Sequence, residues 1–402
     1  MIARLLVIGP ALAVAVSSMQ AQTAARAAVD AVLSGAVARG EIPGVVAIAA
    51  TRSGVIYQGA FGVADLPTRR PLLPDSIFRI ASMTKPVTSA ALMQLVEAGR
   101  LRLDDPAAKY LPELAGVQVF ERFDARTGAY AVRPAKQAIT VRHLLTHTAG
   151  FGYPFTSPVV RDFTPRDGEQ YAAGPLLFEP GEGWTYGTNT DWVGRLVEVI
   201  SGRPLEMYFR ERIFTPLGMR ETFYNVPEDT RARVVTVHRR TGDVTFTVEP
   251  VQPPLTNPRP IGGGGLSSTA ADYIRFLRMV LDGGALDGAR VLSSDTVALM
   301  ARNHIGSLGP ELKTALPDRS GDFPFGPGDK WGLGFLITGV QQPGKRSPGS
   351  LSWGGINNTY FWVDPTRGVA GVILFQFLPF ADSRALAVHD AFERAIYQLA
   401  GS

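Results

Sequence analysis

The chain has 402 residues, of which 45% are hydrophobic and 19% are charged, and this balance excludes a disordered tail, a coiled coil and a collagen-like chain. The 40 basic and 36 acidic residues leave a net charge of +4 without a run of five like charges, so nucleic acid is a poor candidate partner. Because cysteine is absent, disulfides, thiol nucleophiles and cysteine-ligated metals are excluded.

The N-terminus has the pattern of a secretory signal peptide. Arg4 supplies a positive charge, the segment 5–16 is apolar, and small residues lead to Ala21. We therefore expect residues 1–21 to be removed, which leaves a periplasmic or secreted protein without a membrane span. The alternative is an apolar N-terminal helix in a cytoplasmic protein.

The first hundred residues contain alternating helical and strand patterns. The spacing of apolar residues predicts a helix over 24–37, strands over 45–51 and 55–61, and a helix over 81–98. Arg52-Ser53-Gly54 joins the two strands as a hairpin, and Gly99 ends the second helix. Residues 101–138 show little periodicity.

The middle of the chain is mainly helical in this interpretation. Helices are predicted over 141–147, 190–201 and 204–212, a loop over 152–183, and a flexible link at 262–265. The aromatic residues of 151–155 and 323–325 either form a rim for an acyl group or simply pack a lobe. The four glycines of the link lack the features of a P-loop or a dinucleotide fingerprint.

The C-terminal third returns to strands. The predicted elements are helices over 269–281, 293–303 and 385–399, a long loop over 305–330, and strands over 331–338, 351–353, 359–363 and 369–377. Since strands lie at both ends of the chain, we expect an α/β (α+β) protein with one sheet built from both ends. Residues 22–100 and 265–402 would form this α/β domain, and 101–264 a mainly helical inserted domain.

One short segment has the chemistry of an activated nucleophile. Pro86 is tolerated only in the first turn of a helix, so the helix begins close to Ser82. Ser82 and Lys85 then lie on one face of that turn, where the positive potential of the helix N-terminus favours an oxyanion. A serine beside a lysine that can take up its proton is a nucleophile. The alternative is a helix-capping serine with a surface lysine.

Three motifs resemble, in order and spacing, those of the serine β-lactamase-like superfamily. They are Ser82-Met83-Thr84-Lys85, Trp184-Thr185-Tyr186-Gly187-Thr188 and Trp353-Gly354-Gly355. The segments 143–150, 262–272 and 361–365 are similar as well, and the resemblance extends from about residue 25 to the C-terminus. The Trp-Gly-Gly form resembles that of family VIII carboxylesterases rather than true class C β-lactamases. The resemblance implies a β-lactamase-like fold with an antiparallel sheet flanked by helices.

The resemblance also implies the roles of the site residues. Ser82 would be the nucleophile, Lys85 and Tyr186 would share general-base and general-acid work, and the N–H groups of Ser82 and Ile356 would form the oxyanion hole. The residues that would contact substrate are Thr188, Trp353, Gly354 and Gly355.

Two departures from the family pattern bear on the substrate. Thr188 stands where asparagine is usual, with Asn189 adjacent. Trp353 stands where true β-lactamases have a lysine that binds the carboxylate of the lactam, and an indole cannot supply that charge. The departure favours neutral esters over anionic lactams.

Two other patterns give weaker evidence of a functional site than the three motifs do. His143 and His147 share one face of a predicted helix, but without a following glutamate or a third ligand they indicate a packed helix end rather than a metal site. The Gly-x-Ser-x-Gly pentapeptide of α/β-hydrolases is absent.

These observations predict a serine hydrolase that cleaves short-chain carboxylic esters, small molecules, through an acyl-enzyme. It would need no cofactor and no metal. The alternatives are a β-lactamase or D-amino-acid peptidase, an acyltransferase that uses an alcohol in place of water, and a binding protein on the same scaffold. The Ser82, Lys85 and Tyr186 set argues against the binding protein.

Overall fold

The computed structural model describes residues 10–401, with side chains described from Gln20 onward. Its centre is an eight-stranded antiparallel sheet in the order β12-β13-β14-β15-β16-β1-β2-β3. The strands are β1 (Gly44–Thr51), β2 (Gly54–Asp65), β3 (Arg70–Pro71), β12 (Lys330–Trp331), β13 (Leu336–Ile337), β14 (Leu351–Gly355), β15 (Thr359–Asp364) and β16 (Val369–Leu374).

The two ends of the chain meet in the middle of this sheet. β1 pairs with β16 in a register that places Val46 opposite Leu374, so the predicted sheet from both termini is confirmed. Both strands are almost continuously apolar and buried, as expected for strands that are covered on both faces.

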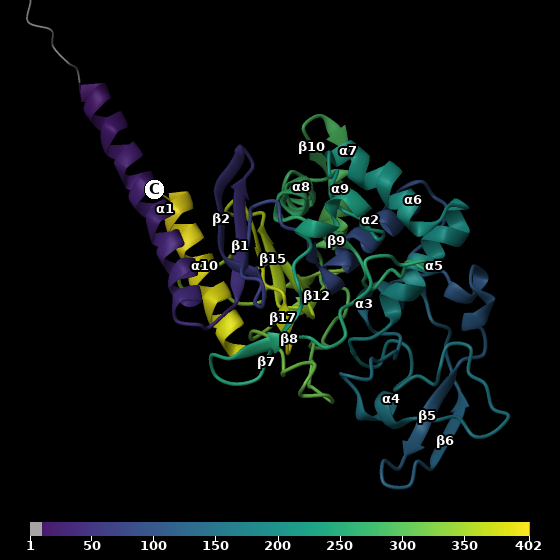
Figure 1. Cartoon of the computed structure of the whole chain (residues 1–402). Coiled ribbons are helices and arrows are strands. Elements are labelled where there is room, and N and C mark those ends of the chain that lie inside the picture. The colour runs from purple at the N-terminus through teal and green to yellow at the C-terminus, as the bar shows by residue number, and fades with distance from the viewer. Residues whose placement is uncertain (1–9, 402) are drawn as a thin grey trace, which may run out of the picture.

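Helices cover the sheet on both faces. α1 (Pro10–Ala38) and α10 (Ser383–Gly401) pack against each other on one face, at the left of Figure 1. α8 (Ala270–Leu281) contacts β1, β15 and β16 from the other face, where α2 (Thr84–Glu97) also lies. Thr269 caps α8 by accepting a hydrogen bond from the Asp272 N–H, at the predicted start of this helix.

Residues 101–264 supply most of the remaining helices. These are α3 (Val141–Thr146), α4 (Pro158–Asp162), α5 (Asn189–Ser201), α6 (Leu205–Phe209) and α7 (Thr215–Leu217), with one π-helical turn (Arg210–Phe214) between α6 and α7. α5 packs on α2 and carries the predicted apolar stripe on its buried face. The division into two domains stays a prediction.

The segment 101–138 contains a hairpin that its periodicity did not predict. β5 (Gln118–Phe123) pairs with β6 (Tyr130–Pro134) in a lobe at the lower right of Figure 1. Its small core is an edge-to-face group of Phe120, Tyr130 and Phe163. The apolar pattern is weak because most residues of both strands are partly or fully exposed, and the aromatic contact includes Phe163, the residue that ends α4.

Two further predicted strands differ from those in the structure. The predicted strand 331–338 is two short strands, β12 and β13, since Gly334 with φ +96° allows a tight turn between them. The predicted strand 369–377 ends at Leu374, and β17 (Phe377–Leu378) joins a separate sheet. There it lies beside β7 (His238–Arg240), which pairs with β8 (Phe246–Val248).

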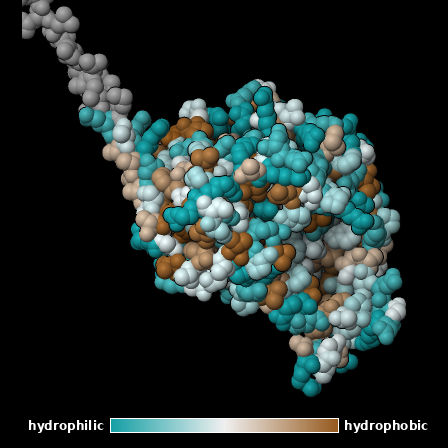
Figure 2. Space-filling model, in the orientation of Figure 1, coloured by the Kyte–Doolittle hydropathy of each residue, from teal (hydrophilic) through white to brown (hydrophobic). Residues whose placement is uncertain are grey.

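The face of the protein shown in Figure 2 is mostly hydrophilic. Figure 2 shows hydrophilic side chains over most of the visible face, with apolar ones scattered among them. Within the described part of the chain, no helix has both the length and the apolar character needed to cross a membrane. The predicted signal peptide falls partly on residues 1–9, which lie outside the described residues, and α1 continues across Ala21.

Candidate active site

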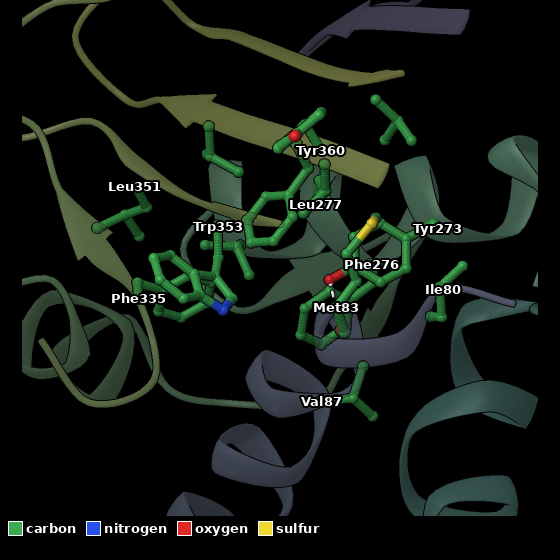
Figure 3. Close-up of a cluster of buried hydrophobic side chains, with 14 of the residues drawn as sticks. Ile80, Met83, Val87, Tyr273, Phe276, Leu277, Phe335, Leu351, Trp353 and Tyr360 are labelled. Carbon is green, nitrogen blue, oxygen red and sulfur yellow. Dashed lines mark hydrogen bonds between the residues drawn. The ribbon is translucent and has the colours of Figure 1, made fainter. Parts of the chain in front are cut away.

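Ser82 lies in a short turn directly before α2. A 3₁₀ turn, η1 (Ala81–Met83), runs directly into α2, so the helix begins where Pro86 requires it to begin. The backbone at Ala81 is held at φ +47°, a conformation that costs a non-glycine residue energy and is often found at functional sites. Figure 3 shows the Tyr273 hydroxyl donating to the Met83 carbonyl oxygen at 2.8 Å, which anchors this junction on α8.

Lys85 is fully enclosed at this helix start. Its side chain is 1% exposed, and Nζ donates to Ser82 Oγ at 3.2 Å, to the Tyr153 hydroxyl at 3.3 Å and to the Gly263 carbonyl oxygen at 2.7 Å. An ammonium has three N–H donors, and three acceptors are present. Two of the acceptors are hydroxyls that can also donate, so the same cage can hold the neutral amine. The predicted pairing of Ser82 with Lys85 is therefore present in the structure.

Tyr186 lies over Lys85 from the loop before α5. Its ring centroid is 4.6 Å from Lys85 Nζ, and its hydroxyl accepts a hydrogen bond from Trp353 Nε1 at 3.1 Å. The phenol that directly hydrogen-bonds Lys85 is that of Tyr153, not Tyr186. The structure thus brings Tyr186 to the site while placing its hydroxyl on the indole.

Tyr153 is a site residue that the sequence did not single out. It stacks on Phe155 with ring centroids 5.1 Å apart. Burial, with the charge of Asp191 and the nearby Tyr186, raises its pKa well above the usual value, so the phenol keeps its proton. The only signal was the aromatic run 151–155, which pointed equally to a rim or to packing.

The glycines at 262–265 are packed rather than flexible. A Cβ on Gly262 would clash with the Thr190 carbonyl, and one on Gly263 would lie 2.5 Å from Asp191 Oδ1 and 2.9 Å from the Tyr153 hydroxyl. The predicted flexible link is therefore wrong in this structure, because only a chain without side chains fits between α2 and α5. We call residues 262–265 the glycine strap.

Gly355 allows β14 to approach Ser82. A Cβ at this position would clash with the Ile80 carbonyl oxygen and with the Thr359 hydroxyl. The close approach places Ile356 beside Ala81, where both residues line one cavity. The N–H groups of Ser82 and Ile356 thus come from segments that lie against each other, as an oxyanion hole requires.

Trp353 is part of a buried aromatic cluster. It is 2% exposed and contacts the rings of Tyr186, Phe323, Phe325 and Trp331 at centroid distances of 4.7 to 6.2 Å. Figure 3 shows its indole between Leu351 and the start of α2. Trp353 therefore orients Tyr186 in addition to bordering the predicted acyl site.

The residues next to Thr188 are buried and pack beside Tyr186. Thr188 is the N-cap of α5 without a side-chain capping bond, and Asn189 donates to His147 Nδ1 at 3.1 Å and to the Phe151 carbonyl at 3.2 Å. His147 lies 4.9 Å from the Tyr186 ring, and burial, together with the charge of Lys85, lowers its pKa well below the usual value. A neutral His147 packs the back of the site.

His143 belongs to a helix cap. Its Nδ1 accepts from the Thr140 N–H at 3.3 Å, while the Thr140 hydroxyl accepts from the His143 N–H at 3.2 Å. Among the described residues, no group of three histidine or acidic side chains is arranged to hold a metal ion.

A cavity of about 330 Å³ borders Ala81, the residue before Ser82, although Ser82 itself is not among its lining residues. Its lining includes Ala81, Ile356 and the apolar Leu266, with the guanidinium groups of Arg79 and Arg319. Burial lowers the pKa of Arg79 to about 10, so this group stays cationic at neutral pH. The cavity can take a small molecule that has an apolar body.

Comparison with known proteins identifies the family and the fold. The beta-lactamase family model matches residues 29–395. The chain belongs to the beta-lactamase family. The predicted resemblance and the β-lactamase-like fold are thereby confirmed.

Among curated relatives, protein Rv1367c of Mycobacterium tuberculosis is 34% identical over 85% of this chain and 87% of its own length. Monacolin J acid methylbutanoyltransferase of Aspergillus terreus is 31% identical over 89% and 92% of the two chains. Lovastatin esterase of Penicillium rubens is 32% identical over 92% and 98%.

Among solved structures, unliganded simvastatin synthase (LovD) of Aspergillus terreus has a TM-score of 0.77 at 28% identity, and the match covers 93% of this chain and 98% of that chain. EstCE1, a hydrolase with promiscuous acyltransferase activity, has a TM-score of 0.72 at 23% identity, covering 93% and 99%, which supports the fold.

The indole N–H of Trp353 gives a testable role within this beta-lactamase family site. Trp353→Phe keeps an aromatic ring but removes the donor to Tyr186, and a hydrogen bond of this kind contributes about 0.5–1.5 kcal/mol. We expect kcat for a p-nitrophenyl ester to fall about two- to tenfold with KM nearly unchanged.

Trp331→Phe is the matched control, because Trp331 is buried in the same cluster and donates instead to the Leu145 carbonyl. Equal losses in the two variants would show that packing, not the Tyr186 contact, is what Trp353 provides.

Proposed function

We propose that this protein is a serine hydrolase that cleaves short-chain carboxylic esters through an acyl-enzyme on Ser82, with the specificity of a family VIII-like carboxylesterase. The observation that carries the proposal is the hydrogen bond between Ser82 Oγ and a lysine that is 1% exposed. A buried amine beside a hydroxyl, at a helix start, is the arrangement of an activated serine.

In the proposed reaction, Lys85 takes the proton of Ser82 while Oγ attacks the ester carbonyl carbon. The N–H groups of Ser82 and Ile356 bind the oxyanion of the tetrahedral intermediate. As this collapses, the C–O bond to the alcohol breaks and the alcohol leaves with a proton delivered from the Lys85–Tyr186 pair. Water then attacks the carbonyl carbon of the acyl-enzyme and gives a proton to the same pair. As the bond from that carbon to Ser82 Oγ breaks, the pair returns the proton to Oγ, and the acid and free Ser82 are released.

Neutral esters fit the site better than penicillins. Trp353 stands where a lysine would bind the lactam carboxylate, and its N–H is engaged by Tyr186. The ester reaction needs no such cation. Thr188, Gly354 and Gly355 would border the acyl group, and no cofactor or metal enters the reaction.

Acyl transfer to an alcohol other than water is the second candidate function. The cavity of about 330 Å³ beside Ala81 and Ile356 has room for an acceptor. The chain is similar both to a protein named monacolin J acid methylbutanoyltransferase and to one named lovastatin esterase, which supports keeping both functions. A secreted or periplasmic location, predicted from residues 1–21, completes the proposal, with a cytoplasmic location as the alternative.

Removal of the nucleophile tests the proposal. Ser82→Ala should lower kcat for p-nitrophenyl acetate or butyrate by roughly 10⁴-fold or more, the scale for loss of a nucleophile. Ser89→Ala is the matched control, because Ser89 is a buried serine of the same helix whose hydroxyl has no hydrogen-bond partner. An active Ser82→Ala protein would place the nucleophile elsewhere.

Substrate preference is a separate prediction. Loss of one charge-assisted hydrogen bond costs about 1.5–3 kcal/mol, so kcat/KM for penicillins should lie at least about ten- to a hundredfold below that for p-nitrophenyl butyrate. The measurement is a side-by-side panel of p-nitrophenyl esters, penicillins and a D-Ala-D-Ala peptide. Penicillin turnover faster than ester turnover would mean that Arg79 or Arg319 replaces the missing lysine, and the protein would be a β-lactamase.

A further inference from the structure

Asp191 is a half-buried carboxylate close to Lys85 that the reaction above does not use. It occupies the third residue of α5, and its Oδ1 accepts a hydrogen bond from the Gly263 N–H at 2.7 Å. The carbonyl oxygen of the same Gly263 accepts from Lys85 Nζ at 2.7 Å. Gly263 therefore links the Asp191 carboxylate to Lys85 through two hydrogen bonds, one at its N–H and one at its carbonyl oxygen.

The strap is fixed from both sides. Thr88 on α2 donates to the Gly262 carbonyl oxygen at 2.7 Å, and the neighbouring Gly263 N–H is turned toward α5, where Asp191 receives it. A Cβ on Gly194 would lie 2.9 Å from Gly262 Cα, so α5 and the strap touch along their backbones. Movement of Asp191 would therefore move the carbonyl that holds Lys85.

Lys85 needs a counter-charge that its contacts do not supply. Ser82, Tyr153, Tyr186 and the Gly263 carbonyl are neutral, and among residues 20–401 Lys85 forms no ion pair. His147 is held neutral by burial. An ammonium forms each time Lys85 takes the Ser82 proton, and a buried charge without compensation is costly.

Asp191 is placed to provide that compensation. Burial raises the pKa of its carboxyl group, while the charge of Lys85 and the Gly263 hydrogen bond lower it. The same carboxylate contributes to the raised pKa of Tyr153, whose hydroxyl lies with Asp191 on the side of Gly263 that a Cβ would occupy. The charge of Asp191 therefore acts both on Lys85 and on Tyr153, which accepts a hydrogen bond from Lys85.

We propose that Asp191 is a positioning residue that acts on Lys85 through Gly263: it holds the carbonyl acceptor in place and supplies the negative charge that stabilises the ammonium. This inference rests on the proposed role of Lys85 as the base for Ser82. It predicts that the charge of Asp191 sets the pH range in which Ser82 is reactive.

Asp191→Asn removes the charge and keeps an oxygen that can accept from Gly263. The groups facing Lys85 are otherwise unchanged: Ser82, Tyr153, Tyr186 and His147. Without the carboxylate the ammonium is less stable, so the free amine persists to lower pH. The acid limb of Ser82 reactivity should move to lower pH by about 0.5–1 unit, the lower end of shifts caused by a nearby charge.

Asp272→Asn is the matched control. Asp272 is the third residue of α8, is buried, has a pKa raised by burial, and accepts the Glu221 N–H at 2.7 Å. It has no contact with Lys85 or the strap. This variant tests the loss of a buried helix-start carboxylate without altering the site.

The readout is the rate at which a fluorophosphonate labels Ser82 between pH 5 and 10, with thermal unfolding measured on each variant. This rate reports the reactivity of Ser82 whether or not the protein hydrolyses simple esters. We expect the shifted acid limb for Asp191→Asn alone. An unshifted limb, an equal shift in Asp272→Asn, or failure of Asp191→Asn to fold would overturn the inference.

A wild-type protein that labels at Ser82 but does not turn over esters would contradict the proposed ester hydrolysis while leaving the Asp191 measurement valid. Absence of labelling at Ser82 would contradict both.

Discussion

Lys85 carries an amine into the interior of the protein, and the rest of the site is built around that one nitrogen. A buried amine is stable only when each of its N–H groups has an acceptor. Here the acceptors come from three separate places: Ser82 on the same helix, Tyr153 on the loop after α3, and Gly263 on the strap. A change in any one of these segments would alter the position of Lys85 Nζ relative to Ser82 Oγ.

The fold supplies those segments from distant parts of the sequence. The sheet carries β14 against η1 because Gly355 lacks a side chain, and α8 fixes the same turn through Tyr273. α5 lies against α2 with the strap between them, so the inserted segment and the sheet meet at Lys85. The aromatic cluster of Trp353, Trp331 and Tyr186 closes the remaining side.

Local patterns in the sequence were enough to predict the helix start at Ser82, the pairing of Ser82 with Lys85 and the sheet built from both ends. Each of these follows from a short-range constraint, such as Pro86 in a first turn or an apolar strand. Tyr153 is 68 positions from Lys85 and Gly263 is 178 positions away, and nothing in their local sequence indicates that they meet. The glycine strap illustrates the limit: four glycines are typical of a mobile link, whereas here Gly262 and Gly263 are required by close contact with Thr190 and Asp191.

The proposed ester hydrolysis passes through an ester of Ser82. The direct measurement is to mix the protein with p-nitrophenyl butyrate, quench within the first turnover, and identify the acylated peptide by mass spectrometry while following nitrophenol release. If an acyl-enzyme forms on Ser82, we expect a burst of nitrophenol equal to the enzyme concentration, with the butyryl group on Ser82. Turnover without a covalent intermediate, or a butyryl group on another residue, would contradict it.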